Sequence, residues 1–382
     1  MCAYSAMVFV SVFQLLPAAP YRVLELGGTA AAAGLFLGLL AFSSALSAPI
    51  TGPIGDRLGH RRVLITVSLT LALFSASYAV ISDHRLMLAV VAVHGLFWSA
   101  LLSSSGAYMT ATIPASRRAE GLSYWGLTSI LALGAAPALG FWVHRFGWAT
   151  LCVEIVALNL IMAGIAWRLP DDRLPDDASS PRPHASSPLF HLVEWRVLLL
   201  SIAMAMISFG YGSLTSFSAL FADALLVTPR SLFLTAMAVA VCAGRIFIGR
   251  ALDRIGYRRV LLPCLAVPPL GLLLLAGAQG RLSFLVAALV FGAGFGLMYP
   301  SYTAYVLEHV PANRRGAAFG AMLAAFDTGI GTGSSVMGWL VHHYWFRVGF
   351  AVAAGIAALS LPYFLVAERK IWGRGRTSEV IS

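Results

Sequence analysis

The residues of this chain that could do chemistry are the few ionisable side chains inside long apolar runs. The sharpest is Asp327, within Phe326-Asp-Thr-Gly-Ile-Gly-Thr-Gly333. A charge at the centre of a membrane helix costs at least about 2.5–3.5 kcal/mol, so such residues are seldom accidental. A carboxyl group there, facing a cavity, could bind and release a proton. The alternative is a structural hydrogen bond to the backbone of a neighbouring helix.

Four further polar residues stand inside apolar runs. Glu154 is a second candidate proton site. Arg245 could bind an anionic substrate, pair with a carboxylate, or extend its guanidinium group to the lipid headgroups. His94 would titrate near neutral pH if water reached it, although a lone membrane histidine is more often a packing residue. Tyr211 is a candidate for the lining of a cavity.

The sequence lacks the residue patterns of catalytic and metal-binding sites. No HExxH occurs, and the adjacent pair His342 and His343 has no acid nearby. The four cysteines show no CxxC spacing, and we interpret them as buried thiols. The sequence therefore predicts neither an enzyme, nor a metal site, nor a bound cofactor.

Composition places these residues in a membrane protein. Of the 382 residues, 59% are hydrophobic and 11% are charged, whereas soluble domains carry roughly 25% charged residues. The net charge of +10 comes from short Arg clusters between apolar runs, not from one patch that could follow phosphates. We therefore expect a lipid bilayer as partner, and no nucleic acid.

Twelve apolar runs are long enough to span a bilayer, which takes about 17–25 residues. They lie at residues 3–20, 30–51, 63–82, 86–109, 122–143, 148–167, 197–222, 231–251, 260–279, 282–307, 317–341 and 347–367. The first run is short for a span and begins almost at the first residue, so the completeness of the N-terminus stays open. The pattern predicts an all-α polytopic membrane protein with twelve transmembrane helices.

Arg and Lys residues predict the orientation, because cytoplasmic loops are enriched in them. Nineteen lie in loops and tails on one side and six on the other. We expect both termini in the cytoplasm, and the chain in the cytoplasmic (inner) membrane. The predicted organisation is an N-terminal six-helix bundle (1–168), a polar cytoplasmic linker (169–195), a C-terminal six-helix bundle (196–368) and a cytoplasmic tail (369–382).

The two halves of the chain are related by a repeat. The segment Gly52-Pro-Ile-Gly-Asp-Arg-Leu-Gly-His-Arg-Arg-Val63 recurs 197 residues later as Gly249-Arg-Ala-Leu-Asp-Arg-Ile-Gly-Tyr-Arg-Arg-Val260. The segments Pro114-Ala-Ser-Arg-Arg118 and Pro311-Ala-Asn-Arg-Arg315 match at the same offset. Two separate matches at one offset indicate that each half is the same unit, placed in the same orientation.

With these motifs the sequence resembles the major facilitator superfamily over its whole length. The loop motif GxxxDRxGRR of that family is matched after the second and eighth runs, with His60 and Tyr257 in place of the usual first basic residue. The resemblance implies two six-helix bundles (the MFS fold) and a cytoplasmic latch that stabilises the outward-open state. The alternative is that these charges only enforce topology. The predicted latch residues are Gly52, Asp56, Arg57, Gly59, Arg61, Arg62, Gly249, Asp253, Arg254, Gly256, Arg258 and Arg259.

A second motif bears on the direction of transport. Gly134-Ala-Ala-Pro-Ala-Leu-Gly140 is similar to the Gly/Pro motif in the fifth helix of drug/proton antiporters. Pro137 and Gly140 match that motif, whereas Ala136 and Phe141 depart from it. The resemblance favours efflux, although small residues also serve ordinary close helix packing.

The position of Asp327 joins these observations. It lies eleven residues from Gly316, where its run leaves the cytoplasm, which is about 16 Å into a core about 30 Å thick. We predict a monomeric secondary active transporter that moves a small-molecule substrate by alternating access, and we favour efflux coupled to protons. The alternative is an uptake symporter or facilitator of a small solute such as a sugar or organic anion. No feature of the sequence names the substrate.

Overall fold

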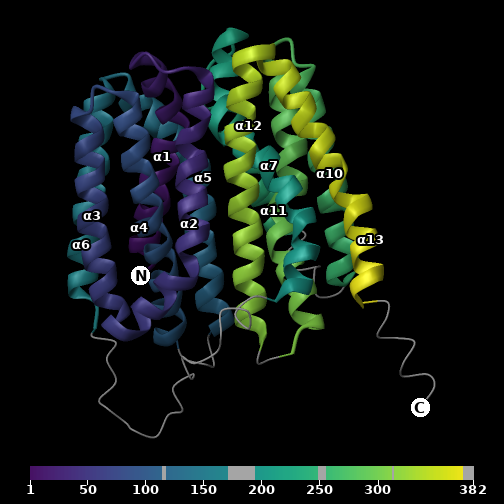
Figure 1. Cartoon of the computed structure of the whole chain (residues 1–382), viewed down its shortest axis with the longest axis horizontal. Coiled ribbons are helices and arrows are strands. Elements are labelled where there is room, and N and C mark those ends of the chain that lie inside the picture. The colour runs from purple at the N-terminus through teal and green to yellow at the C-terminus, as the bar shows by residue number, and fades with distance from the viewer. Residues whose placement is uncertain (114–117, 171–193, 248–254, 312–313, 373–382) are drawn as a thin grey trace, which may run out of the picture.

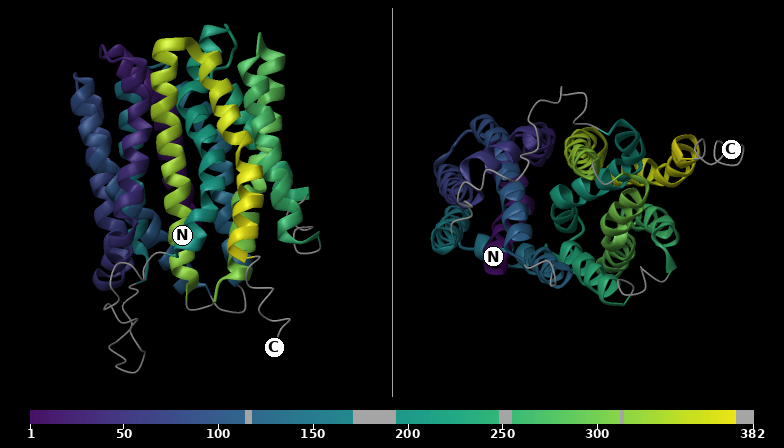
Figure 2. Two further views of the ribbon diagram at one scale, coloured as in Figure 1. Left: turned by 45° about the vertical axis from the view of Figure 1, so that its right-hand side comes forward. Right: turned by 90° about the horizontal axis from the view of Figure 1, so that it is seen from below.

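The computed structural model describes residues 1–113, 118–170, 194–247, 255–311 and 314–372, and every element in these ranges is an α-helix. Figure 1 shows two helical bundles standing side by side, the first half of the chain in one and the second half in the other. The view from below in Figure 2 shows the same division.

The first bundle contains six helices. They are α1 (Cys2–Glu25), α2 (Ala30–Leu58), α3 (His60–Val80), α4 (His84–Thr112), α5 (Arg118–His144) and α6 (Trp148–Arg168). Polar residues begin two of them: Thr29 Oγ1 accepts a hydrogen bond from the Ala32 amide at 3.2 Å, and Asp83 Oδ1 accepts one from the Arg85 amide at 2.8 Å. Gly59, at φ 88°, makes the turn from α2 to α3.

The second bundle contains α7 (Trp195–Ala224), α8 (Leu232–Phe247), α10 (Tyr257–Ala276), α11 (Arg281–His309), α12 (Arg315–Ala358) and α13 (Ser360–Trp372). The long helix α12 breaks direction at Trp345, whose φ is 77°. It therefore holds the predicted run 317–341 and the start of the run 347–367, which α13 completes. Each predicted span thus corresponds to a helix, and the predicted fold class is confirmed.

The repeat is visible in the backbone. Gly256 precedes α10 with φ 90°, as Gly59 precedes α3 with φ 88°, and the two glycines are 197 residues apart. An L-amino acid with a side chain rarely adopts this conformation, so both copies of the loop motif need glycine here.

The first helix extends beyond the apolar run predicted for it. The run covers residues 3–20, whereas α1 has 24 residues and continues through Tyr21 and Arg22 to Glu25. These residues have polar ends that can reach water while their stems stay with the helix, so an apolar run misses them. The eighth predicted span, 231–251, ends among residues 248–254, which lie outside the described ranges.

The bundles meet where α2 packs against α12. We name the ends of the molecule by residues: the Tyr21 face, where α1 ends and α2 begins, and the Asp56 face, where α2 ends and α3 begins. Toward the Tyr21 face, a Cβ atom added to Gly338 would lie 3.0 Å from the Cα of Gly34. Ser334 Oγ also donates a hydrogen bond of 2.7 Å to the Gly34 carbonyl oxygen. Absent side chains let the two backbones approach closely, as glycine pairs do in membranes.

The same two helices separate toward the Asp56 face. On α12 the residues Gly338, Gly331, Asp327, Gly320 and Gly316 are spaced by seven and four, so they lie along one side of the helix. A Cβ atom at Gly331 would touch the ring of Phe42 on α2, whereas one at Gly320 or Gly316 would meet nothing within 4 Å. Along α2 and α12, the described residues of the two halves are therefore in contact toward the Tyr21 face, and α12 has open space beside Gly320 and Gly316 toward the Asp56 face.

Candidate functional site

Asp327 lies where the two halves part. It belongs to α12, and its Oδ2 atom accepts a hydrogen bond of 3.3 Å from the hydroxyl of Ser44 on α2, in the other half. Ser44 is buried, whereas Asp327 is partly exposed. The predicted proton site is thus an interface carboxyl group with a partner from across the interface.

A row of aromatic side chains runs beside Asp327. Phe291, Phe295 and Tyr299 follow one another at intervals of four residues on α11 and therefore share one face. Phe295 stacks on Tyr211 of α7 with ring centroids 4.7 Å apart, and Tyr299 meets Phe326 of α12 at 5.5 Å. We call these five side chains the aromatic row. It brings the predicted cavity residue Tyr211 and the neighbour of Asp327 into one cluster.

Arg245 approaches the same helix from α8. Its Nε atom donates a hydrogen bond of 3.2 Å to the carbonyl oxygen of Gly296, the residue after Phe295. Within the part of the chain that the structure describes, no carboxylate forms an ion pair with Arg245. The cation is therefore held by the backbone of its own half, close to the aromatic row.

Glu154 lies away from the interface. Its Oε1 atom accepts a hydrogen bond of 3.2 Å from Nε2 of Gln14, which joins α6 to α1 inside the first bundle. The other carboxylate oxygen of Glu154 and the amide oxygen of Gln14 are buried without a hydrogen-bond partner. The structure therefore does not bring the two candidate carboxyl groups, Glu154 and Asp327, together.

His94 is packed inside the first bundle. Its Nδ1 atom lies 3.1 Å from the hydroxyl of Tyr78, and its ring stacks on Phe74 with centroids 5.4 Å apart. The side chain is only 5% exposed. Tyr78 is held in turn, because the indole nitrogen of Trp148 donates to its backbone carbonyl at 2.8 Å. This is the geometry of a packing residue.

The described contacts of the first copy of the loop motif lie within its own half. Asp56 is 73% exposed and lies 3.4 Å from the ring of His60, four residues on. Arg61, at the start of α3, donates a hydrogen bond to the carbonyl oxygen of Trp167, near the end of α6. Arg57 and Arg62 are exposed on the same face.

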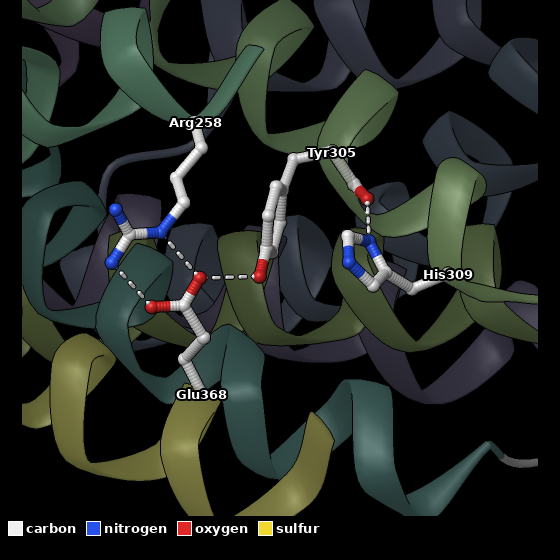
Figure 3. A network of polar contacts seen from close by, with 4 residues as sticks. All are labelled: Arg258, Tyr305, His309 and Glu368. Carbon is white, nitrogen blue, oxygen red and sulfur yellow. Dashed lines mark hydrogen bonds and ion pairs between the residues drawn. The ribbon is translucent and has the colours of Figure 1, made fainter. Parts of the chain in front are cut away.

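The second copy forms a network within the other half, drawn in Figure 3. Arg258 donates two hydrogen bonds, of 2.7 and 2.9 Å, to the carboxylate of Glu368 on α13. The hydroxyl of Tyr305 on α11 donates to the same carboxylate at 2.5 Å, and Nδ1 of His309 lies 2.8 Å from the Tyr305 carbonyl oxygen. Arg258 is the repeat counterpart of Arg61.

Both arginines therefore tie the third helix of their half to its last. The contacts named here for the two arginines each lie within one half. Gly249, Asp253 and Arg254 lie outside the described residues, as do most of the predicted linker and the end of the predicted tail.

The span-five motif lies at a close helix contact. A Cβ atom at Gly140 would lie 2.9 Å from the Cα of Gln14 on α1, and Pro137 is buried in α5. Close packing of α5 on α1 therefore accounts for glycine at position 140.

Sequence reasoning missed Ser44 and most of the aromatic row. Nothing in the sequence aligns the faces of α2 and α12, so Ser44 carried no signal. The spacing of four in Phe291, Phe295 and Tyr299 was a usable signal, because it places three aromatic rings on one face of a helix.

The fold and this site define a class of protein: a multi-pass helical membrane transporter made of two similar halves. The comparisons with known proteins agree. The Major Facilitator Superfamily matches residues 1–243 and 200–379, so the chain belongs to that family. Its relatives and structural neighbours are transporters of this family and not enzymes.

Among its relatives is the MFS-type transporter YhhS of Escherichia coli K12, 25% identical over 345 residues, which cover 88% of this chain and 83% of YhhS. An MFS-type transporter of Pseudomonas aeruginosa is 28% identical over 352 residues, 89% of this chain and 86% of the relative.

Among solved structures, a variant of the nucleoside transporter NupG aligns with a TM-score of 0.78 at 16% identity, covering 96% of this chain and 98% of NupG. The human organic anion transporter MFSD10 aligns with a TM-score of 0.67 at 15% identity, covering 95% and 97%. These likenesses show the fold.

Proposed function

We propose that the chain exports a small solute across the cytoplasmic membrane in exchange for protons, and that the carboxyl group of Asp327 carries the proton. The observation that supports this is its place between the halves, with the Ser44 hydroxyl of the opposite half as its partner. It lies where the closed part of the interface gives way to the open part.

Burial couples the charge of Asp327 to the movement of the halves. Water can reach the open Asp56 side of the interface, and it can solvate an ionised carboxylate there. When the halves close around the residue, an uncompensated charge would be transferred into a medium that solvates it poorly. Closure is therefore favoured only after a proton or a cationic substrate has neutralised Asp327. This is the requirement for coupling transport to a proton gradient.

The proposed movement is a rocking of the two bundles, residues 1–168 and 196–368, within one monomer. The Arg and Lys distribution assigns the Asp56 face to the cytoplasm, so the conformation described here is inward-open. Asp56, exposed in this conformation, would come to the interface on closing. A latch formed by the loop motifs then belongs to the outward-open state.

For the direction of transport, the proposal rests on the resemblance of the span-five motif to that of drug/proton antiporters, which favours export, although packing on α1 also accounts for its Gly140. A second candidate is uptake of a small planar solute. The aromatic row favours it, since stacked rings offer a flat face on which such a solute could stack, and NupG, which shares the fold, transports nucleosides.

The experiment uses inverted membrane vesicles with an acidic interior and a dye that reports the pH gradient. Export in exchange for protons predicts that an added substrate dissipates the gradient, and a panel of solutes would be screened. Right-side-out vesicles with labelled solutes separate export from uptake. Asp327→Asn should abolish the substrate-induced proton flux, while the exposed helix cap Asp83→Asn serves as the control.

Glu154→Gln separates the two candidate carboxyl groups. Because Glu154 bonds to Gln14 inside one bundle, its replacement should leave proton flux coupled to substrate. Full gradient-driven transport by Asp327→Asn would overturn the assignment of the proton to Asp327.

A further inference from the structure

Three side chains join the halves at the Tyr21 face, at the opposite end from the loop motifs. Tyr21, near the end of α1, donates a hydrogen bond of 2.9 Å from its hydroxyl to Oδ2 of Asp223, near the end of α7 and 202 residues away. Nε of Arg230, between α7 and α8, donates to Oδ1 of the same carboxylate at 2.8 Å. The Arg230 guanidinium carbon also lies 5.0 Å from the centre of the Tyr21 ring.

We propose that Tyr21, Asp223 and Arg230 form the gate that holds the Tyr21 face shut, and that this gate must break in every transport cycle. The proposal needs the two bundles to move against each other. It is independent of the proton, of the role of Asp327 and of the direction of transport.

In each half, neighbouring side chains hold the gate residues in place. The Tyr21 ring meets Phe141 of α5 edge-on, with centroids 5.8 Å apart, and lies 6.5 Å from the ring of His144. Asp223 and Arg230 are paired within the other half. The Tyr21 hydroxyl is thus presented by α1 and α5 to a carboxylate already oriented by Arg230. Separating them breaks one hydrogen bond and one cation–π contact, in addition to the Ser334–Gly34 hydrogen bond between α12 and α2.

The charged pair of the gate, Asp223 and Arg230, is partly exposed, as expected of a contact that breaks and reforms. The Asp223 and Arg230 side chains are 34% and 46% exposed. Water can therefore solvate both groups when Tyr21 leaves, and the carboxylate keeps its arginine partner. A fully buried pair would resist separation more strongly, because each charge would be left without compensation.

The gate has no counterpart at the repeat-related positions. At the offset of 197, Tyr21 corresponds to Ser218, Asp223 to Leu26 and Arg230 to Ala33. Residues that only supported the shared fold of the halves would be expected at both places. These three occur once, at one face and across the interface.

The test follows the opening of the Tyr21 face directly. The four native cysteines are replaced, and Ser335→Cys is introduced on α12, where Ser335 lies against Gly38 of the other half. A membrane-impermeant maleimide is then applied from the Tyr21 side. Tyr21→Phe and Asp223→Asn should each raise the labelling rate about five- to tenfold, the size expected for one partly exposed charge-assisted hydrogen bond. The matched control is Tyr344→Phe, an exposed tyrosine near the end of the first part of α12, which should leave the rate unchanged.

A second measurement separates a gate from a static contact. Cysteines at positions 21 and 223, joined by a short bifunctional thiol reagent, should arrest transport, and a cleavable linker should restore it on reduction. Unchanged labelling in both gate variants, or full transport by the cross-linked protein, would overturn the proposal. If Asp327→Asn loses proton coupling while the labelling rate at Ser335→Cys stays unchanged, the result concerns the proposed proton exchange and leaves the gate proposal untouched. Size-exclusion profiles identify any variant that fails to fold. If a labelling variant fails to fold, the transport rate of the cross-linked protein tests the gate in its place.

Discussion

The hydroxyl of Ser44 and the carboxylate of Asp327 form a hydrogen bond of 3.3 Å between the two halves of the protein. On the Tyr21 side of this bond, α2 and α12 touch through glycines. On the Asp56 side, a Cβ atom added to Gly320 or Gly316 of α12 would meet nothing within 4 Å. The bond therefore lies at the point where the contact between α2 and α12 ends and the open space on the Asp56 side begins. Any movement that exchanges the open side for the closed one changes the surroundings of Asp327.

Replacing Ser44 by alanine should slow transport about two- to tenfold, because a single hydrogen bond contributes roughly 0.5–1.5 kcal/mol. The effect should appear in gradient-driven flux and leave folding intact. Ser43→Ala is the matched control: its hydroxyl bonds to the Leu39 carbonyl oxygen within its own helix at 2.6 Å. Equal rates for the two variants would show that the bond to Asp327 has no part in transport.

His94→Phe tests the packing interpretation. A phenyl ring keeps the stack on Phe74 and loses the contact with the Tyr78 hydroxyl. Stability should fall by about 1–3 kcal/mol, the cost of leaving a buried hydroxyl without its partner, while the pH profile of transport stays unchanged. Thermal unfolding in detergent and flux at several pH values measure the two effects. A displaced pH profile would instead make His94 part of the proton path.

What the sequence could predict differs between the fold and the site. The spans could be predicted because the thickness of a bilayer fixes the length of an apolar run. The repeat could be predicted because the loop motif occurs twice, and Gly59 and Gly256 make the same turn in both copies. Asp327 could be predicted as a functional residue only from its position near the middle of an apolar run. Ser44 could not be predicted, since its contact depends on how two helices 283 residues apart face each other. Tyr21 was missed because it lies just beyond the end of the predicted apolar run 3–20.

Glu368→Gln should destabilise the second bundle by about 1–2 kcal/mol. The carboxylate is 12% exposed and accepts bonds from Arg258 and Tyr305, but Arg258 is itself 49% exposed, so water screens part of the interaction. Thermal unfolding should show the loss, with transport preserved below the transition. Glu25→Gln is the control, because Glu25 is 49% exposed and its ion pair with Arg22 is an i,i+3 pair within one helix. Equal melting curves for the two variants would contradict a bracing role for the Glu368 network.

Two glycines of the interface should respond to valine in opposite ways. At Gly38 an added side chain meets the Ser335 hydroxyl and lies 3.3 Å from the Gly331 carbonyl oxygen, whereas at Gly320 it meets nothing within 4 Å. Overpacking typically costs 1–3 kcal/mol. Gly38→Val therefore disfavours the conformation seen here and should open the Tyr21 face.

Gly320→Val fits this conformation, but its side chain would stand between α12 and α2 when the Asp56 face closes. Both variants should lose transport, so flux alone cannot tell them apart. Pairs of spin labels across each face can: Gly38→Val should lengthen the distances at the Tyr21 face, and Gly320→Val should hold those at the Asp56 face long. The same shift in both variants would mean that the two glycines do not lie on opposite sides of the pivot at Asp327.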